Sequence, residues 1–276
     1  MDNMDHGGRG VRYFLRQRLY PAFCEGLAAL GRPLLLARAA DVTSQTQARS
    51  CLVLAPHPDD ETLGCGATIM RKLAAGARVS VVIATDGRLS PRPGGLSADR
   101  WVALREEETR RACAILGLSD ADLVFLRFED QRLADHRQLL RERLAATLDD
   151  FKPDEMFVSS MIDSHPDHRA LAEVARELAQ AQAQRLQGFY EYPVWFWDPR
   201  LWRIRDLFDL QVRIVRMDEF RLRKREAIAA YRSQITNLTG GRGGAPLRRR
   251  FLRQFTGYEE IFFEIQPAAH LSSAAI

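Results

Sequence analysis

Long hydrophobic runs and cysteine pairs are both lacking in this chain of 276 residues. Charged side chains interrupt the apolar residues of its N-terminal segment: Arg9, Arg12, Arg16, Arg18 and Glu25. No stretch there approaches the roughly 20 apolar residues that span a bilayer, and the pattern is not that of a signal peptide. The four cysteines are scattered, without a C-x-x-C pair, which argues against a disulfide framework and a thiolate zinc site. We therefore expect a reducing, cytoplasmic location.

A large charge surplus is absent as well. Lys and Arg number 40 against 36 Asp and Glu, a net charge of +4, which is too small to indicate nucleic-acid binding. With 46% hydrophobic and 28% charged residues, the composition is that of an ordinary globular protein and excludes global disorder. The length suits one substantial α/β domain, and a second full domain is not expected.

The N-terminal segment allows two interpretations. Its aromatic and apolar residues alternate with arginines: Tyr13, Phe14, Leu19, Tyr20 and Phe23. This pattern fits a basic helix that makes peripheral contact with a membrane surface without crossing it. A helix packed on the domain is the alternative, and it is the one we favour. We assign residues 1–45 to an N-terminal helical extension, 46–266 to the main domain and 267–276 to a tail.

Segments with strand and helix periodicity alternate through most of the chain. The predicted strands are 51–55, 79–84, 123–128 and 156–160, and the predicted helices are 62–75, 100–116, 137–151 and 170–184. Four such alternations predict a Rossmann-like, mostly parallel sheet with helices on both faces. Ligands of such sheets bind at the carboxyl ends of the strands.

The pattern after Gly188 predicts a C-terminal extension of the same sheet. It consists of strands at 210–215 and 258–265 and a helix at 218–235 capped by Asp218. Before these elements comes an aromatic cluster: Tyr190, Tyr192, Trp195, Phe196, Trp197 and Trp202. These rings fit either the core or a wall that stacks on a sugar, and we favour the core.

Two clusters of histidine and aspartate lie directly after predicted strands: His57, Asp59 and Asp60 after the first, and Asp163, His165, Asp167 and His168 after the fourth. Taken alone, each cluster also fits a surface turn before a helix. In a parallel sheet, however, both clusters fall on the same edge. Catalytic zinc commonly takes three His or carboxylate ligands and keeps a fourth position for water. The remaining ionisable groups can serve as general base and acid, an inventory that suits amide hydrolysis.

At these residues the chain resembles the LmbE-like, or PIG-L-type, N-acetylglucosaminyl deacetylases. The first motif of that family reads Ala-His-Pro-Asp-Asp-Glu, and residues 55–61 match it with Pro56 inserted before His57. The second motif, His-Pro-Asp-His-Arg-Ala, matches residues 165–170 at every position. The resemblance extends from Cys51 to about Gln234.

The resemblance implies an LmbE-like fold and an enzyme that removes the N-acetyl group from an N-acetylglucosamine-type sugar, releasing acetate and a free amine. The implied ligands of Zn2+, or of another divalent ion, are His57, Asp60 and His168. The implied catalytic residues are Asp59 as the base that deprotonates metal-bound water, His165 as the group that stabilises the oxyanion or protonates the amine, and Asp167 as the residue that orients His165. The implied substrate is a small-molecule or lipid-linked amino sugar.

Two further residues, Arg105 and Asp130, are implied to bind substrate. Arg105 and Glu108 match the Arg-x-x-Glu helix of the family, although an i,i+3 surface pair is an equal alternative. Asp130 follows the third predicted strand, and residues 231–234 resemble a late family element. Arg88 stands where the family often has Glu, so an anionic or otherwise altered substrate is conceivable.

Two other functions remain open. A different metal-dependent amidase, or a phosphoesterase, would use the same ligands on another bond. A nucleotide-binding α/β module without catalysis is suggested by Gly64-x-Gly66 and the basic C-terminal residues. A Rossmann fingerprint, however, needs its glycines at the turn between strand and helix, where His57 and the aspartates stand.

Overall fold

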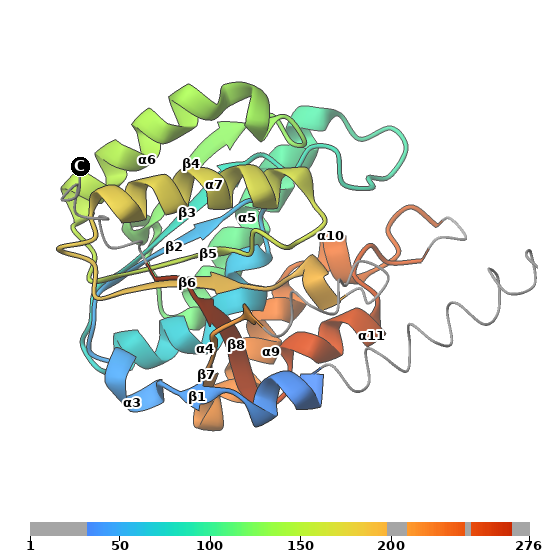
Figure 1. The fold of residues 1–276 in the computed structure, drawn as a ribbon. Helices are drawn as coiled ribbons and strands as arrows, with labels where there is room; N and C mark the ends of the chain where they lie inside the picture. Colours follow the sequence, from blue (N-terminus) through green and yellow to red (C-terminus); the bar gives the residue numbers. More distant parts are fainter. Residues whose placement is uncertain (1–31, 198–208, 241–243, 267–276) are drawn as a thin grey trace, which may run out of the picture.

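Segments rich in apolar and β-branched residues form the strands of one sheet (Figure 1). These strands are β1 (Ala40–Asp41), β2 (Cys51–Ala55), β3 (Val79–Thr85), β4 (Leu123–Phe128), β5 (Glu155–Ser159), β6 (Gly188–Tyr192), β7 (Val212–Arg216) and β8 (Glu259–Glu264). The structure is a computed structural model and describes residues 32–197, 209–240 and 244–266. Within them the strand order is β1-β7-β8-β6-β5-β2-β3-β4. Strands β6, β5, β2, β3 and β4 run parallel, whereas β8 is antiparallel to β6 and β7.

Helices cover both faces of the sheet, as the sequence predicts. The longer ones are α4 (Asp60–Ala74), α5 (Ala98–Leu116), α6 (Arg137–Phe151), α7 (Pro166–Ala181) and α9 (Arg221–Ala230). Figure 1 shows α6 and α7 over one face, with α4 and α9 over the other. Side chains of β2 alternate between the two faces, so its odd-numbered residues join one hydrophobic core and its even-numbered residues join the other. The expected Rossmann-like, mostly parallel sheet with a C-terminal extension is confirmed.

The N-terminal ends of two helices lie earlier than predicted, and this difference bears on the site. Helix α4 begins at Asp60 instead of Thr62, and α7 begins at Pro166 instead of Ala170. In α7 the N-cap is His165, whose side chain accepts the amide N–H of Asp167. Both histidine and aspartate clusters therefore belong partly to the first turn of a helix, where backbone geometry is fixed.

The helix predicted at 218–235 is wrong as a single element. The segment forms a short turn, η6 (Asp218–Phe220), then α9, and then α10 (Arg232–Ile235). The chain leaves helical geometry at Tyr231, whose φ is −79° and ψ is 59°. Asp218 is not a cap, because its carboxylate accepts a hydrogen bond from Arg71 at 2.8 Å.

Several expectations concern residues outside the described ranges: the arginine-rich helix before residue 32, Trp202 and the tail at 267–276. The boundary between 45 and 46 stays a prediction, although β1 lies before it and pairs with β7. Cys51, Cys65 and Cys113 are buried and free. In the part of the chain that the structure describes, no helix combines the length and the apolar character needed to cross a membrane.

The pair Gly64 and Gly66 lies inside α4 and not at the turn after β2. A Cβ atom at Gly64 would lie 2.3 Å from Cδ2 of Tyr192, and one at Gly66 would lie 3.1 Å from Cγ of Lys224. Tyr192 is fully buried, and its hydroxyl donates to the Leu54 carbonyl at 2.8 Å. The two glycines thus allow close packing of α4, and the interpretation of them as a phosphate-binding loop is wrong.

We predict that Gly64→Ala lowers the free energy of unfolding by about 1–3 kcal/mol, because the added methyl overlaps the Tyr192 ring in a packed core. The matched control is Gly94→Ala, since a Cβ there would meet nothing within 4 Å. Urea denaturation of both variants measures the difference, and equal stability of the two would contradict the close packing.

Candidate active site

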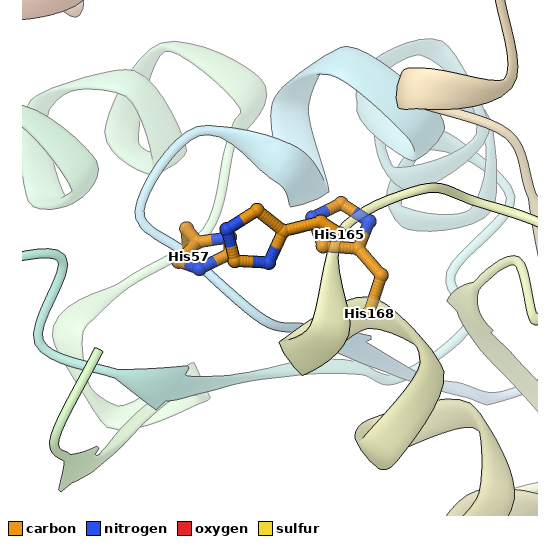
Figure 2. A group of neighbouring side chains, drawn as sticks. All are labelled: His57, His165 and His168. Atoms are coloured by element: carbon orange, nitrogen blue, oxygen red, sulfur yellow. The ribbon is translucent and has the colours of Figure 1, made fainter. Parts of the chain in front are cut away.

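The two motif segments meet because β2 and β5 are neighbouring parallel strands. The chain passes from β2 to β3 and β4 on one side, while β5 and β6 lie on the other, so the strand order reverses between β2 and β5. Such reversal points are where open α/β sheets bind ligands. Figure 2 shows the imidazoles of His57, His165 and His168 gathered at this edge. The predicted meeting of the two clusters is therefore confirmed.

One carboxylate oxygen, Oδ2 of Asp60, lies at the centre of the group. It accepts the backbone N–H of His57 at 3.0 Å and lies 3.2 Å from Nδ1 of that residue. It also lies 3.2 Å from Nε2 of His168. The three residues expected to bind metal thus present one oxygen and two nitrogens to a common point.

The other nitrogen of each imidazole faces a buried carboxylate. Nε2 of His57 lies 3.2 Å from Oδ2 of Asp167 and 3.3 Å from Oδ1 of Asp130. Nδ1 of His168 lies 2.8 Å from Oδ2 of Asp163. Metal-binding histidines are commonly oriented in this way, with the second ring N–H donated to a carboxylate. The arrangement leaves Nδ1 of His57 and Nε2 of His168 for a metal.

Nε2 of His168 is fully buried and has no hydrogen-bond partner among the described residues. It is close to Asp60, but the two atoms do not have hydrogen-bond geometry. A buried nitrogen without a partner is costly unless something else binds it. A divalent cation between His168, Asp60 and His57 would satisfy this atom, so these donors fit a metal.

Asp163 is a functional residue that the sequence places in the cluster without assigning it a role. Besides His168, its carboxylate accepts the backbone N–H groups of Val194 at 3.1 Å and Phe196 at 2.8 Å. These bonds hold Asp163 in place and thereby hold the ring of His168. The one signal in the sequence is its position between a strand and the second motif.

Asp59 has an unusual backbone conformation, with φ of 128° and ψ of −28°. A non-glycine residue in such a region costs on the order of 1–3 kcal/mol, and such strain concentrates at functional sites. Asp59 occupies the N-cap position of α4, yet its side chain makes no capping hydrogen bond. The interpretation of this segment as a plain turn and helix cap is therefore wrong, because the carboxylate is directed elsewhere.

The partner of Asp59 is Arg105, whose guanidinium lies 3.3 Å from Oδ2 of that residue. Arg105 also donates to the carbonyl of Pro58 and to Oγ of Ser90. Arg105 is 2% exposed and Glu108 is 1% exposed, so the alternative of an i,i+3 surface pair is wrong. Arg105 supports the loop that carries Asp59 and also lines the cleft.

The role expected of Asp167 needs a correction. Its carboxylate accepts the backbone N–H groups of Gln131 at 2.7 Å and Leu133 at 3.1 Å, and it faces His57. Contact with His165 is made by the backbone N–H of Asp167, which donates to Nδ1 of that ring at 3.2 Å. Because α7 begins at Pro166, the side chain of Asp167 points toward the loop after β4. Its carboxylate therefore faces His57, and its hydrogen bond to His165 comes from the backbone amide.

The pKa values of His165 and Asp59 shift in opposite directions. Burial lowers the pKa of His165 to about 4, and the nearby His57 and His168 add to this effect. Burial raises the pKa of Asp59 to about 8, although Arg105 opposes the rise. Burial alone would lower the pKa of His168, but Asp60 and Asp163 outweigh it and raise the value to about 9. The ring of His165 is thus neutral at pH 7. The carboxylates of Asp60 and Asp163, in contrast, favour a positive charge at the ring of His168.

The site contains more buried carboxylates than cations. Five aspartates are each at most 7% exposed: Asp59, Asp60, Asp130, Asp163 and Asp167. Among the described residues that contact them, Arg105 is the one buried arginine. Two groups of side chains could hold a cation: His57, His165 and His168, or His57, Asp130, His165 and Asp167. Both groups contain His165 and neither contains Asp60, which the motif implies as a ligand. Metal-binding measurements on substituted proteins can separate these alternative ligand sets.

The site opens into a cleft with a volume of about 300 Å³. Its lining includes the reactive cluster and apolar side chains from several loops: His57, Asp59, Asp60, Leu63, Gly87, Leu89, Ser90, Pro91, Arg105, Asp130, Gln131, His165, Val194, Trp195, Gln234, Pro246 and Leu247. Asp130 lies here, where the sequence expected a substrate contact. Arg88 is not in the lining, since it pairs with Asp86 at 2.7 Å.

The aromatic cluster belongs mainly to the core, as we favoured. Tyr190, Tyr192, Phe196 and Trp197 are at most 8% exposed. Trp195 is the exception, since it is half-buried and lines the cleft. The late element at residues 231–234 also reaches the site: the Tyr231 hydroxyl donates to Glu61, and the Ser233 amide donates to Glu108 at 2.8 Å.

Comparisons with known proteins agree with this geometry. The family model for PIG-L, GlcNAc-PI de-N-acetylase, matches residues 52–179. A diacetylchitobiose deacetylase of Thermococcus kodakarensis is 29% identical over 44% of this chain and 45% of its own length. A 1D-myo-inositol 2-acetamido-2-deoxy-alpha-D-glucopyranoside deacetylase of Thermobifida fusca is 40% identical over 26% of this chain and 28% of its own. The matched region thus spans less than half the length of these relatives.

Solved structures have the same fold over most of the chain. An N,N'-diacetylchitobiose deacetylase from Pyrococcus horikoshii gives a TM-score of 0.65 at 22% identity, covering 97% of this chain and 96% of that one. A conserved protein from Thermus thermophilus gives 0.60 at 25% identity, covering 83% and 100%. The family match contains both histidine and aspartate clusters and the strand pair that joins them, so this part of the chain is similar to the PIG-L family.

Proposed function

We propose that this protein is a metal-dependent N-deacetylase that hydrolyses the acetamide of an N-acetylglucosamine-type sugar or glycoconjugate. The observation that supports this most directly is the convergence of His57, Asp60 and His168 on one point beside the strained Asp59. The relatives named above are deacetylases of N-acetylated glucosamine compounds, which supports the choice of substrate class. Zn2+ is the metal we propose, since His and carboxylate ligands suit it, and other divalent ions are alternatives.

A bound divalent metal would lower the pKa of a water molecule and polarise the acyl oxygen. Asp59 is the proposed general base, because its carboxylate is not used for capping and lines the same cleft as the two imidazoles. Arg105 holds that carboxylate in position and favours its ionised form. Deprotonation of water by a positioned carboxylate would generate the nucleophile for the acetamide carbon.

His165 is proposed to act on the oxygen or nitrogen of the acetamide. Its Nδ1 accepts the Asp167 amide, so in the neutral ring the proton is on Nε2. The lowered pKa keeps the ring neutral at pH 7, which suits a hydrogen-bond donor to the developing oxyanion. Asp59 would then donate the proton that it took from water to the leaving amine. Its raised pKa suits a group that first accepts and then donates a proton.

Metal binding by the purified protein tests the ligand set. Alanine substitution of His57, Asp60 or His168 should remove most of the bound metal, and Asp163→Ala should weaken binding by about 10- to 100-fold, because it loosens His168. His165→Ala should retain the metal, and His136→Ala is the control, because His136 belongs to neither group of side chains that could hold a cation. If His165→Ala loses metal as His168→Ala does, the three-histidine set replaces the proposed one. Elemental analysis and competition with a chelating dye measure the outcome.

Substitution of Asp59 tests the base. We expect Asp59→Asn to lower kcat for acetate release by roughly 100- to 10,000-fold, since the amide cannot accept the proton of water. The metal content should stay that of the unsubstituted protein, because Asp59 is not a proposed ligand. Full activity in this variant, or activity that survives complete chelation of the metal, would contradict the mechanism.

The pH dependence of kcat/KM tests the pairing of Arg105 with Asp59. The base must be ionised, so the rate falls as pH drops below the pKa of Asp59. Arg105 lowers that pKa, and removal of its charge in Arg105→Met should raise the pKa and move the acid limb to higher pH by about one unit. Arg105→Lys retains the charge and should shift the limb less. Arg127→Met, which removes a surface arginine paired with Glu106, should leave the profile unchanged.

A further inference from the structure

The lining of the cleft includes a polar set of side chains, here called the floor, and an apolar set, here called the wall. The floor contains His57, Asp59, Asp60, Asp130 and His165, where the acetamide would react. The wall contains apolar side chains from three separate loops: Leu89 and Pro91 after β3, Val194 and Trp195 after β6, and Pro246 and Leu247 before β8. Both sets line the same cavity, so a group attached to a sugar beside the floor residues has apolar side chains within the same cleft.

Leu89 is the most informative residue of this wall. It is 50% exposed, and of the exposed large hydrophobic residues in the described chain it is the one that lines the cleft. Its backbone N–H donates to Oδ2 of Asp130 at 2.9 Å. The other oxygen of Asp130 lies 3.3 Å from Nε2 of His57. The position of this exposed leucine is therefore fixed relative to the reacting groups.

Trp195 and Leu247, two other residues of the wall, are also held in place by contacts with neighbouring residues. The ring of Trp195 stacks on Phe251, with the ring centroids 4.9 Å apart and the planes at 27°. The backbone N–H of Leu247 donates to the carbonyl of Gln234 at 2.8 Å. Trp195 therefore presents a half-buried ring to the cleft, and Leu247, which is buried, lines the same cleft.

The charges around the cleft do not favour an anionic group next to the sugar. Arg88 pairs with Asp86 and lies outside the lining. Arg105 is the one arginine or lysine in the lining formed by the described residues. Its guanidinium is already engaged by Asp59, Pro58 and Ser90. A phosphate or carboxylate on the far side of the sugar would thus find no available cation among these lining residues.

We infer that the substrate carries an apolar aglycone, an alkyl or aryl group, that packs against Leu89 and Trp195 while the N-acetylated sugar lies beside the floor residues. This inference rests on the proposed deacetylase function and specifies its substrate class. Apolar surface that leaves water on binding raises affinity, and a stacked aromatic ring offers a large rigid contact. The wall thereby selects among sugars that share the same acetamide.

The test measures kcat/KM of the metal-loaded protein by acetate release from three N-acetylglucosaminides of one anomer. Their aglycones are methyl, n-octyl and carboxypentyl, each used below its micelle concentration. We expect the octyl glycoside to exceed the methyl glycoside by roughly tenfold or more, since a buried methylene contributes about 0.8 kcal/mol. The carboxypentyl glycoside should fall well below the octyl one.

Variants locate the preference on the wall. Trp195→Ala and Leu89→Ser should each reduce the ratio of octyl to methyl kcat/KM by at least threefold, mainly through KM of the octyl glycoside. Trp195→Phe retains a ring and should retain most of the preference, which separates loss of the contact from misfolding. The matched control is Leu222→Ser on α9, a leucine that is 75% exposed and outside the cleft lining.

The outcomes separate this inference from the proposed function. Equal kcat/KM for methyl and octyl glycosides, or a preference for the carboxypentyl one, would overturn the inference while leaving the deacetylase in place. A preference for octyl that Trp195→Ala and Leu89→Ser leave unchanged would overturn the assignment to this wall. Acetate release from none of the three glycosides would count against the proposed function itself.

Discussion

The parallel pairing of β2 with β5 is the contact on which the site depends. The register places Cys51 opposite Glu155 and Leu54 opposite Val158, so both strands end at one level of the sheet edge. His57 and His165 then follow from adjacent strands, and their rings come within 4.5 Å between centroids. A shift of this register would move the two motifs apart, and none of the other site contacts could compensate for it.

A buried ion pair strengthens this arrangement from the opposite end of α4. Nζ of Lys72 lies 2.6 Å from Oε2 of Glu155 and also donates to the carbonyl of Thr46. Lys72 lies in the last turn of α4, whose first turn carries Asp60, and Glu155 is the first residue of β5. The C-terminal end of helix α4 therefore binds to β5, and its N-terminal end presents Asp60, the proposed ligand. Charges buried in this way are stable only with their partners present.

Much of the architecture follows from local patterns in the sequence. The strands at 51–55 and 123–128 and the helix at 137–151 have the predicted ends. Strong hydrophobic periodicity and clear stops produce this agreement. Helix α6 ends at Phe151, and its C-cap Lys152 has a left-handed conformation before Pro153. The prediction of one helix at 218–235 is wrong for a different reason. The chain leaves helical geometry at Tyr231, whose hydroxyl contacts the distant Glu61, and no local pattern reveals this contact.

The sequence by itself determined the alternation of strands and helices, the presence of two histidine and aspartate motifs and the strand ends that carry them. Only the tertiary structure decided how the acidic residues divide their work. Four of these residues have the same side chain and lie close together in sequence, two in each cluster: Asp59 and Asp60, and Asp163 and Asp167. Their partners differ: Asp59 contacts Arg105, Asp60 lies near the imidazoles of both His57 and His168, Asp163 contacts His168, and Asp167 contacts His57. Sequence spacing tells which residues reach the same edge of the sheet, whereas side-chain direction, which depends on where each helix begins, decides what each of them binds.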